Sequence, residues 1–568
     1  MSSSVVTDLL GLAGIWRNPV FERFRRSRLR FRKSIFWILL TLIITTFAVS
    51  LSYVIGQNVG LTSELAARRI WISLLIIQGL ILLIKGTGSV SAGLIQDKID
   101  QTIDYQRLTP LKPIHCIVGY LFGLPVLEYV MFALTLPHLV FVVVVGDIPL
   151  TTVLSVYAAF FCCAMLYHTT AIAAGMVMRR WILGYLLSVF LVLVVNVILP
   201  TFISQLGLKF VQYLSMWPVI SQKVAPLVFS LDGSGISQNI YLSFADAVPF
   251  YDWTLSPFAF TLVLQVALIA TFGVMALRRW ESEAKHSLSK TYALGFLSVF
   301  VVVLIGNVWP AITGQYMPFA IFGETNIERL REGIAIAFPL VYCFVLWWLC
   351  FALLAIVIPS HHACVRGIRR ALKRGRSRAL AWDDDATNVP FLMLFPAVAV
   401  AGFAVLFAEI SSSGFLEFVE PSERGFWRLP VSLGLVVAYS VLLLQVLELK
   451  KTVLAILLVW FVPILLAVVF SAASQRFGVV HAVVAGLSPI ALVVMSGFVP
   501  LVPLAPTTFD YELAAIVPGV YVGLASVIAQ MGWLAYRWRQ LHRKFMMLCD
   551  TFGPGAESEI ACVTPAET

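Results

Sequence analysis

The chain has 568 residues, of which 60% are hydrophobic and 12% are charged, and its formal net charge is +10. Soluble domains carry about twice that share of charged residues, so the composition excludes a water-soluble globular protein and a disordered chain. Apolar runs of about 20 residues recur along the whole length, and each can cross the hydrocarbon core of a bilayer. The short alternating segments of a transmembrane β-barrel do not occur. We therefore expect an all-α polytopic membrane protein.

Residues 1–34 form a basic leader before the first apolar run. Trp16, Val20, Phe24 and Phe31 follow one another at helical spacing, and arginines occupy the other faces. This pattern predicts an amphipathic helix at the cytoplasmic membrane surface, with its basic residues toward anionic lipid headgroups. A plain topological anchor, which needs the positive charge alone, explains the leader equally well.

About twelve apolar segments are predicted to cross the membrane. They cover residues 35–56, 70–95, 114–145, 150–177, 181–203, 257–277, 292–312, 332–358, 389–409, 430–449, 452–472 and 513–536. A further apolar run, 479–503, contains three prolines and two glycines. We expect this run to be a re-entrant, broken segment, because irregular backbone at membrane depth is tolerated where protein surrounds it.

The distribution of positive charge predicts that both termini lie in the cytoplasm. This orientation places 31 of the 40 lysines and arginines on the cytoplasmic side, including those of residues 85–112, and 9 on the outside. A bias of this kind is the usual determinant of topology. The basic residues lie in short clusters between apolar runs, which argues against a nucleic-acid partner.

The two halves of the chain, 35–290 and 291–568, share a pattern. Each has six predicted spans, and each has a basic pair between the fourth and the fifth: Arg179–Arg180 and Lys450–Lys451. The pattern predicts two six-helix units, the second a degenerate repeat of the first, which is a common plan among transporters. A six-span domain followed by six unrelated helices is the alternative.

A charged segment, 96–108, follows the second span. Ile95, Ile99 and Ile103 recur at every fourth position, with aspartates on the other faces, and Thr109-Pro110 ends the run. The spacing predicts a short cytoplasmic helix joined to two spans. On its chemistry alone, a solvated loop helix explains the segment.

The segment resembles the signature of ABC-2-type permeases, the membrane subunits of many bacterial ABC exporters. Asp97 stands at the family's acidic position, Gln101-Thr102-Ile103-Asp104 at Gly-Thr-Leu-Glu, and Leu108-Thr109-Pro110-Leu111 at the Thr-Pro-Leu element. Ile117-Val118-Gly119-Tyr120 is similar to the start of the family's third span, and Asn18-Pro19-Val20 to its opening. Gln101 replaces the usual glycine and Tyr120 the usual lysine. The resemblance covers about residues 16–280, and the second half lacks the signature.

The resemblance implies that helix 96–108 couples the chain to a nucleotide-binding subunit. The implied coupling residues are Asp97, Asp100, Gln101, Thr102, Asp104, Arg107, Thr109 and Pro110. ATP and Mg would be bound by that partner, since the phosphate-binding pattern GxxxxGK[ST] does not occur in this chain. The implied function is a permease of the cell inner membrane that exports a lipid, a glycan or a hydrophobic compound. If the two units are not a fused pair, a homodimer or a second permease completes the membrane part.

Three ionisable residues at membrane depth are candidates for a translocation path: Glu128 and His138 in the third predicted span and His168 in the fourth. A carboxylate there is a functional candidate because its burial is costly. An ion-coupled secondary transporter that uses Glu128 is therefore one alternative. A neutral, hydrogen-bonded glutamic acid with a structural role also explains a glutamate at this position.

A membrane enzyme acting on lipid-linked substrates is the second alternative. It needs carboxylates or histidines that converge at one membrane face, and the sequence shows scattered ones. His361, His362 and Cys364 have ligand-type side chains but lack a second cluster at zinc spacing. We expect neither a catalytic residue nor a metal site or bound cofactor in this chain.

Overall fold

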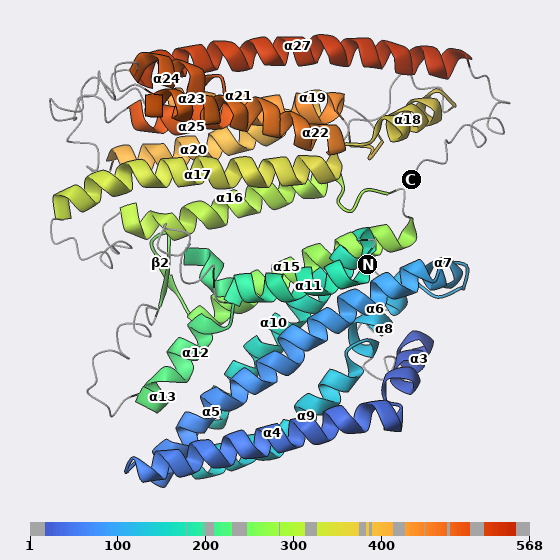
Figure 1. Cartoon of the computed structure of the whole chain (residues 1–568), viewed down its shortest axis with the longest axis vertical. Coiled ribbons are helices and arrows are strands. Elements are labelled where there is room, and N and C mark those ends of the chain that lie inside the picture. The colour runs from blue at the N-terminus through green and yellow to red at the C-terminus, as the bar shows by residue number, and fades with distance from the viewer. Residues whose placement is uncertain are drawn as a thin grey trace. The chain divides into compact units, whose positions relative to one another are not determined.

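The computed structural model is about 87% helical, and Figure 1 shows its helices coloured along the chain. The structure describes residues 18–178, 180–196, 198, 209–229, 247–282, 285–312, 327–373, 382–385, 389–412, 427–447, 449–473, 478–499 and 516–551. The chain divides into two compact units, residues 1–287 and 288–568.

Within the described residues, ten helices are long and apolar enough to cross a membrane. The predicted spans 181–203 and 452–472 are represented in those residues by the shorter apolar helices Trp181–Asn196 and Leu454–Phe470. The prediction of an all-α, multi-pass membrane protein is confirmed. The count of twelve spans stays a prediction.

The described part of unit 1 begins with a short helix and continues with long apolar helices, and the elements below are those of its described residues. Its elements are α3 (Pro19–Arg28), α4 (Phe31–Asn58), α5 (Ser63–Gly79), the π-helical segment η1 (Leu80–Gly86), α6 (Thr87–Ile99), α7 (Thr102–Arg107), α8 (Pro113–Gly123), α9 (Val126–Val145), α10 (Leu150–Val177), α11 (Trp181–Leu193), the 3-10 helix η4 (Lys209–Leu214), α12 (Trp217–Lys223), α13 (Ala225–Phe229), β1 (Val248–Phe250), β2 (Trp253–Leu255) and α15 (Pro257–Glu281). β1 and β2 form an antiparallel hairpin.

The basic leader is helical over α3, and Trp16 lies outside the described residues. Asn18 caps the start of α3, because its Oδ1 accepts a hydrogen bond from the backbone N–H of Val20 at 3.0 Å. The helix ends at Arg28, and Phe31 begins α4 instead. The predicted leader helix is thus shorter than the spacing of its aromatic residues indicates.

One uninterrupted helix of 37 residues, Ser63–Ile99, contains α5, η1 and α6. At 1.5 Å per residue it is about 55 Å long, well beyond the ~30 Å core of a bilayer. The helix therefore extends beyond the predicted span 70–95 at both ends, and the bounds of the membrane-crossing part stay a prediction. In Figure 1 this helix crosses unit 1 obliquely, and α7 lies at its end.

The predicted third span, 114–145, is two helices, α8 and α9, which are separated at Leu124 and Pro125. A proline has no N–H to donate to the preceding turn, and its ring clashes with the carbonyl four residues before it. Glu128 therefore lies in the first turn of α9 and not in the middle of a long span.

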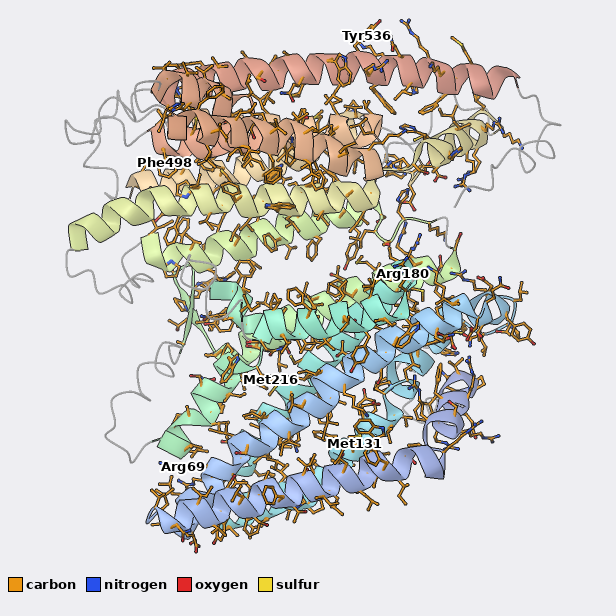
Figure 2. All side chains as sticks on the ribbon, viewed as in Figure 1. Arg69, Met131, Arg180, Met216, Phe498 and Tyr536 are labelled. Atoms are coloured by element: carbon orange, nitrogen blue, oxygen red, sulfur yellow. The ribbon has the colours of Figure 1, made fainter. Side chains whose placement is uncertain are left out.

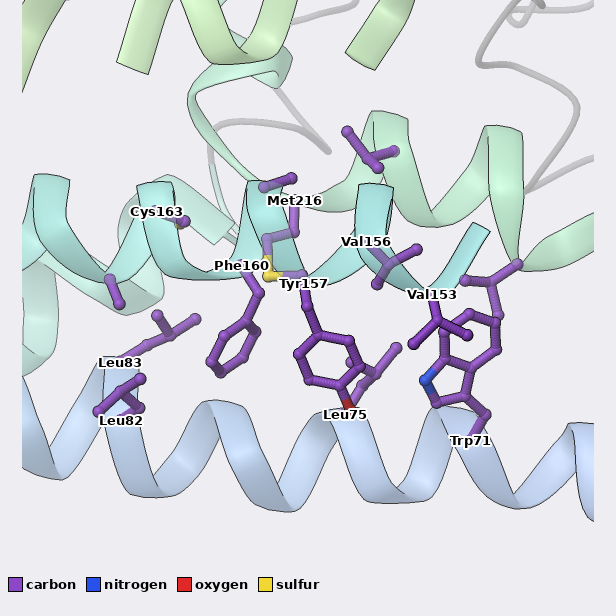
Figure 3. Close-up of a cluster of buried hydrophobic side chains, with 14 of the residues drawn as sticks. Trp71, Leu75, Leu82, Leu83, Val153, Val156, Tyr157, Phe160, Cys163 and Met216 are labelled. Atoms are coloured by element: carbon purple, nitrogen blue, oxygen red, sulfur yellow. The ribbon is translucent and has the colours of Figure 1, made fainter. Parts of the chain in front are cut away.

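The core of unit 1 lies between the helix Ser63–Ile99 and α10. Figure 3 shows Trp71 and Leu75 of the first helix facing Val153, Tyr157 and Phe160 of the second. Their large apolar side chains, each less than 9% exposed, hold the two helices side by side. This packing fixes the frame on which the polar residues described below are placed.

Unit 2 has a similar set of long apolar helices. Its elements are α16 (Lys290–Ile312), α17 (Ile327–Val357), α18 (His361–Lys373), α19 (Val389–Leu392), α20 (Leu394–Ser412), α21 (Arg428–Val446), α22 (Leu449–Ile456), the π-helical segment η6 (Leu457–Phe461), α23 (Val462–Ala473), α24 (Gly478–Gly486), α25 (Pro489–Phe498) and α27 (Ile516–Thr551). Of these, α21 is the central helix: it contacts α17, α20, α25 and α27, and 72% of its apolar window is buried.

The apolar run 479–503 contains two short helices, α24 and α25, separated at Leu487 and Ser488. Each is shorter than the 18 residues or so that cross a bilayer core. Both pack on α27. The segment is broken, as predicted, and its re-entrant path stays a prediction.

Candidate functional site

The predicted coupling segment begins where α3, α6 and α8 meet. Asp97, near the end of α6, is 7% exposed. Arg23 of α3 donates a hydrogen bond to its Oδ1 at 2.8 Å, and the hydroxyl of Tyr120 on α8 donates to its Oδ2 at 2.7 Å. Asp97 is therefore turned into the protein, and any part it has in coupling passes through these two contacts.

Apolar packing surrounds this polar contact. The rings of Phe24 and Tyr120 lie 5.1 Å apart, and those of Tyr120 and Trp280 lie 5.4 Å apart. A Cβ at Gly119 would lie 2.7 Å from the Cβ of Val20, so α3 can approach α8 only because Gly119 has no side chain. The apolar face of the leader helix thus packs on protein. Its basic face at the membrane surface stays a prediction.

The predicted helix 96–108 is interrupted, because a turn at Asp100 and Gln101 separates α6 from α7. Gln101 has a φ of 57°, in the left-handed region that glycine adopts far more readily than other residues. This is the position at which the resemblance to ABC-2-type permeases expects glycine. Gln101, which replaces that glycine, therefore has a strained backbone conformation, and the strain amounts to about 1–2 kcal/mol.

Arg107, at the end of α7, fastens this helix to the end of α15. Its Nε donates to the carbonyl of Trp280 at 2.9 Å, and its Nη2 donates to the carbonyl of Arg279 at 3.0 Å. The last carbonyls of a helix lack partners within it and carry partial negative charge, which a guanidinium neutralises. A third bond, from Nη1 to Asp104 at 2.7 Å, closes the turn within α7.

The remaining surface of the turn and α7 faces outward. Tyr105 and Leu108 are 72% and 86% exposed, and the carboxylates of Asp100 and Asp104 are exposed beside them. We call these four residues the α7 tip. Large apolar side chains left in water among charged ones are typical of an interaction site. Tyr105 and Leu108 are absent from the predicted coupling residues, although two apolar side chains in a charged segment were a signal for them.

The other predicted coupling residues frame the α7 tip. Thr102 is the first residue of α7 and is partly exposed. The hydroxyl of Thr109 donates to the carbonyl of Gln106 at 2.6 Å and ends the segment, and Pro110 after it is exposed. The structure thus brings Asp100, Gln101 and Asp104 together at one exposed turn. Asp97 and Arg107 hold that turn in place.

A second group of polar residues surrounds Glu128, which is 3% exposed. Nζ of Lys85 and the hydroxyl of Ser89 each donate to Glu128 Oε1 at 2.9 Å. Met131, labelled in Figure 2, places its Sδ 3.5 Å from the same Nζ. Lys85 also lies over the ring of Trp37, 4.5 Å from the centroid. Glu128 is thus an ion-paired carboxylate.

The surroundings of Glu128 are of the kind found near the boundary of a bilayer core. Trp37 is six residues from the start of α4, and Glu128 is two from the start of α9, a helix of 20 residues. A helix of that length is about 30 Å long, which matches the whole core. Tryptophans and lysines gather at such boundaries, where their polar ends reach water.

His168 lies in α10 and is fully buried. Its Nε2 is 3.1 Å from the carbonyl oxygen of Leu82 in η1, and its Nδ1 is 3.4 Å from the hydroxyl of Tyr129. The imidazole of α10 thus contacts the backbone of the π-helical segment η1. His168 therefore contacts Tyr129, the residue that follows Glu128 on α9.

A third contact continues the same face of the helix Ser63–Ile99. The side-chain amide of Gln78 donates to Thr135 at 2.8 Å and accepts from the hydroxyl of Tyr157 at 2.6 Å. His138 does not belong to this group: its Nε2 lies 3.0 Å from the hydroxyl of Thr46 on α4. Glu128 and His168 thus lie close together and His138 lies apart from them, and the translocation path through the three residues stays a prediction.

The polar contacts of this helix form one stripe, made by Gln78, the carbonyl of Leu82, Lys85 and Ser89. Their spacing of four, three and four residues places them on a single helical face. The sequence signal for the stripe is polar residues at helical spacing inside an apolar run. Charge counting grouped Lys85 with the cytoplasmic residues 85–112 and did not pair it with Glu128, and the side on which Lys85 lies stays a prediction.

In the described part of the chain, no group of three or more His, Cys, Asp or Glu side chains could hold a metal ion. His361 and Cys364 belong to α18, where Cys364 is 2% exposed. Burial raises the pKa of the Cys364 thiol to about 12, so the thiol stays protonated at neutral pH.

Comparisons with known proteins do not assign this chain to a family. No family model matches the chain, and neither a curated protein nor a solved structure matches it.

Proposed function

We propose that this chain is the membrane subunit of an ABC-2-like transporter, driven by ATP that a separate nucleotide-binding subunit hydrolyses. The proposed location is the cell inner membrane, with both termini in the cytoplasm. The proposed action is export of a lipid, a glycan or a hydrophobic compound. One chain with two units would supply the whole membrane part, and a homodimer or a second permease would be needed if unit 2 is not a permease unit.

The observation that carries the proposal is the α7 tip. It is an exposed turn that combines two apolar side chains with two carboxylates, and it follows directly from a helix long enough to cross a membrane. A partner with an apolar socket flanked by lysines or arginines would bury Tyr105 and Leu108 and pair with Asp100 and Asp104. Burial of aromatic and aliphatic anchors is the usual source of affinity at such contacts.

The proposed transmission uses two connections from the tip. The first is the helix Ser63–Ile99, whose length lets a displacement at one end move residues inside the bilayer. The second is Arg107, which joins α7 to the end of α15 through two carbonyls. A force on the tip would therefore move two membrane helices together. The polar stripe at Gln78–Ser89 belongs to the first of them.

An ion-coupled secondary transporter that uses Glu128 remains the alternative. The buried contact of Glu128 with Lys85 and Ser89 favours it, because a buried carboxylate is a candidate for ion exchange. This alternative requires transport without an ATPase and loss of ion coupling in Glu128→Gln. A membrane enzyme acting on lipid-linked substrates stays the third candidate.

The test is a gentle detergent purification from native membranes, with quantitative mass spectrometry of co-eluting proteins. We expect a stoichiometric partner that contains a phosphate-binding P-loop. The double variant Tyr105→Ala/Leu108→Ala should release it, because it removes the apolar contact with the partner. Both side chains are exposed, so we expect the fold of the variant to be intact. A chain that elutes alone, repeatedly and at low salt, would contradict the proposal.

A matched control separates docking from a general loss of exposed aromatic surface. Trp253 in the β1–β2 hairpin is 70% exposed, close to the value of Tyr105, and lies outside the α7 tip. Trp253→Ala should retain the partner. Release of the partner by both variants would show that the α7 tip is not the docking site.

A further inference from the structure

The helix α27 of unit 2 changes from apolar to basic near its end. It has 36 residues and is about 54 Å long, whereas the hydrocarbon core of a bilayer is ~30 Å thick. No charged residue occurs from Ile516 to Ala535. Residues 536–547 then contain four basic side chains and no acidic one: Arg537, Arg539, Arg543 and Lys544. The helix therefore has a part suited to the membrane core followed directly by a basic part.

Packing within unit 2 determines which face of the basic part is outward. Leu534 and Phe545 are 2% and 6% exposed, and they share one face because eleven residues make three helical turns. α18 packs on α27 there, with the ring of His361 5.4 Å from that of Phe545. Tyr536 is 60% exposed and lies on the side of α27 away from the other helices of unit 2 (Figure 2). We call this outer side, from Trp533 to Lys544, the basic face of α27.

The four basic side chains have no counter-ion among the described residues. Each is exposed, and none forms an ion pair in the part of the chain that the structure describes. Arg537 donates instead to the neutral side-chain amide of Gln540 at 3.4 Å. On the neighbouring α18, by contrast, Arg370 pairs with Asp385. Four like charges within about 10 Å of helix repel one another, so an anionic surface outside the protein would stabilise this end of α27.

The position of the basic face along the helix favours lipid as the anionic partner. Trp533, which is 55% exposed, and Tyr536 precede the first arginine, and such rings gather where hydrocarbon meets headgroups. The guanidinium of Arg537 lies over the ring of Trp533, 5.6 Å from its centroid. Only 22% of the apolar window of α27 is buried, so lipid chains can cover most of that part of the helix. The headgroups of the same lipids then lie beside the basic residues that follow.

We propose that the basic face of α27 binds the headgroups of anionic phospholipids in the adjacent leaflet. The phosphate and other anionic oxygens of the headgroups accept hydrogen bonds from the arginines, and the rings of Trp533 and Tyr536 pack at the level of the glycerol. The lipid supplies the negative charge that the described part of the protein does not. This surface does not depend on the proposed function, because it uses unit 2 alone and requires only that α27 crosses the membrane.

The test places a photo-reactive amino acid at Gln540, among the basic residues. The full-length chain is reconstituted in nanodiscs with equal amounts of phosphatidylglycerol and phosphatidylcholine and irradiated, and mass spectrometry identifies the lipid on the cross-linked peptide. We expect phosphatidylglycerol to be cross-linked at least about fivefold more, which corresponds to about 1 kcal/mol, the usual contribution of one basic side chain at an anionic membrane surface. The matched position is Ala529, exposed on the same face three turns earlier, where both lipids should be cross-linked equally through their acyl chains.

Two variants test whether charge causes the preference. Arg537→Gln/Arg543→Gln/Lys544→Gln should lower it several-fold, whereas Arg537→Lys/Arg543→Lys, which retains both charges, should keep it. The comparison of positions 529 and 540 needs neither variant, so the proposal stays testable if one of them does not fold. Equal cross-linking of the two lipids at position 540, or an undiminished preference in the glutamine variant, would overturn the proposal. A cross-link to an acidic protein instead of lipid in native membranes would overturn it as well and make this face a protein interface.

Discussion

Asp97→Ala should loosen α3 from α6 and α8. The change leaves the hydroxyl of Tyr120, on a side chain that is fully buried, without its acceptor, and an unsatisfied buried donor costs about 1–3 kcal/mol. It also removes the ion pair with Arg23, whose side chain is 43% exposed, and such pairs contribute at most about 1 kcal/mol. The free energy of unfolding should therefore fall by about 1–4 kcal/mol.

The assay combines unfolding in mixed micelles with alkylation of Cys116. This thiol is fully buried in α8, in the same apolar cluster as Val20 and Phe24 of α3. If α3 detaches, Cys116 should react at least about tenfold faster, since 1.4 kcal/mol changes an opening equilibrium tenfold. Mass spectrometry of the labelled peptide distinguishes Cys116 from the other cysteines.

Asp100→Ala is the matched control, because this exposed aspartate accepts hydrogen bonds only from Gln96, four residues before it, in the part of the chain that the structure describes. Its effect should stay within about 0.5 kcal/mol. The reasoning is refuted if Asp97→Ala unfolds at the wild-type denaturant concentration and labels Cys116 no faster than Asp100→Ala does.

Three further changes test other contacts by unfolding in mixed micelles. Gln101→Gly should be neutral or stabilising by up to about 1 kcal/mol, because glycine relieves the left-handed strain; a clear loss of stability would contradict the turn. Gly119→Ala should destabilise by about 1–3 kcal/mol, since the new methyl group meets Val20, and an unchanged stability would disprove the close approach of α3. Glu128→Gln should destabilise by about 1–3 kcal/mol by leaving Lys85 without its counter-charge, and Glu128→Gln/Lys85→Gln should recover part of this; additive losses would contradict the pair.

The fold class follows from the sequence because the length and polarity of apolar runs decide it. The apolar helices lie close to the predicted segments for this reason. The exceptions are at helix ends and breaks. Pro125 can kink a long helix or separate two, and periodicity does not distinguish these outcomes. The helix Ser63–Ile99 continues beyond its apolar run. The charged side chains of Asp97 and Lys98 at its end form hydrogen bonds with Arg23 and with the carbonyl of Met176, respectively.

The sequence indicates which segment forms the candidate site, but not which of its residues are buried and which are exposed. Three aspartates, Asp97, Asp100 and Asp104, occur in one charged run, and the first is buried by partners 74 and 23 residues away in sequence. No local pattern contains that information. The stripe through Lys85 was missed for the same reason, since its partner Glu128 comes from another helix. Gln101 was recognised as a departure, and its backbone angle gives the physical reason why glycine suits that position.

The most direct test of the central claim places a photo-crosslinking amino acid at position 105, at the exposed α7 tip. After irradiation of native membranes, peptide mass spectrometry identifies what the tip touches. The account predicts a cross-link to a protein with a phosphate-binding P-loop, lost in the presence of Leu108→Ala. Cross-links to lipid alone, or to no partner at all, would contradict the claim that the α7 tip docks an ATPase.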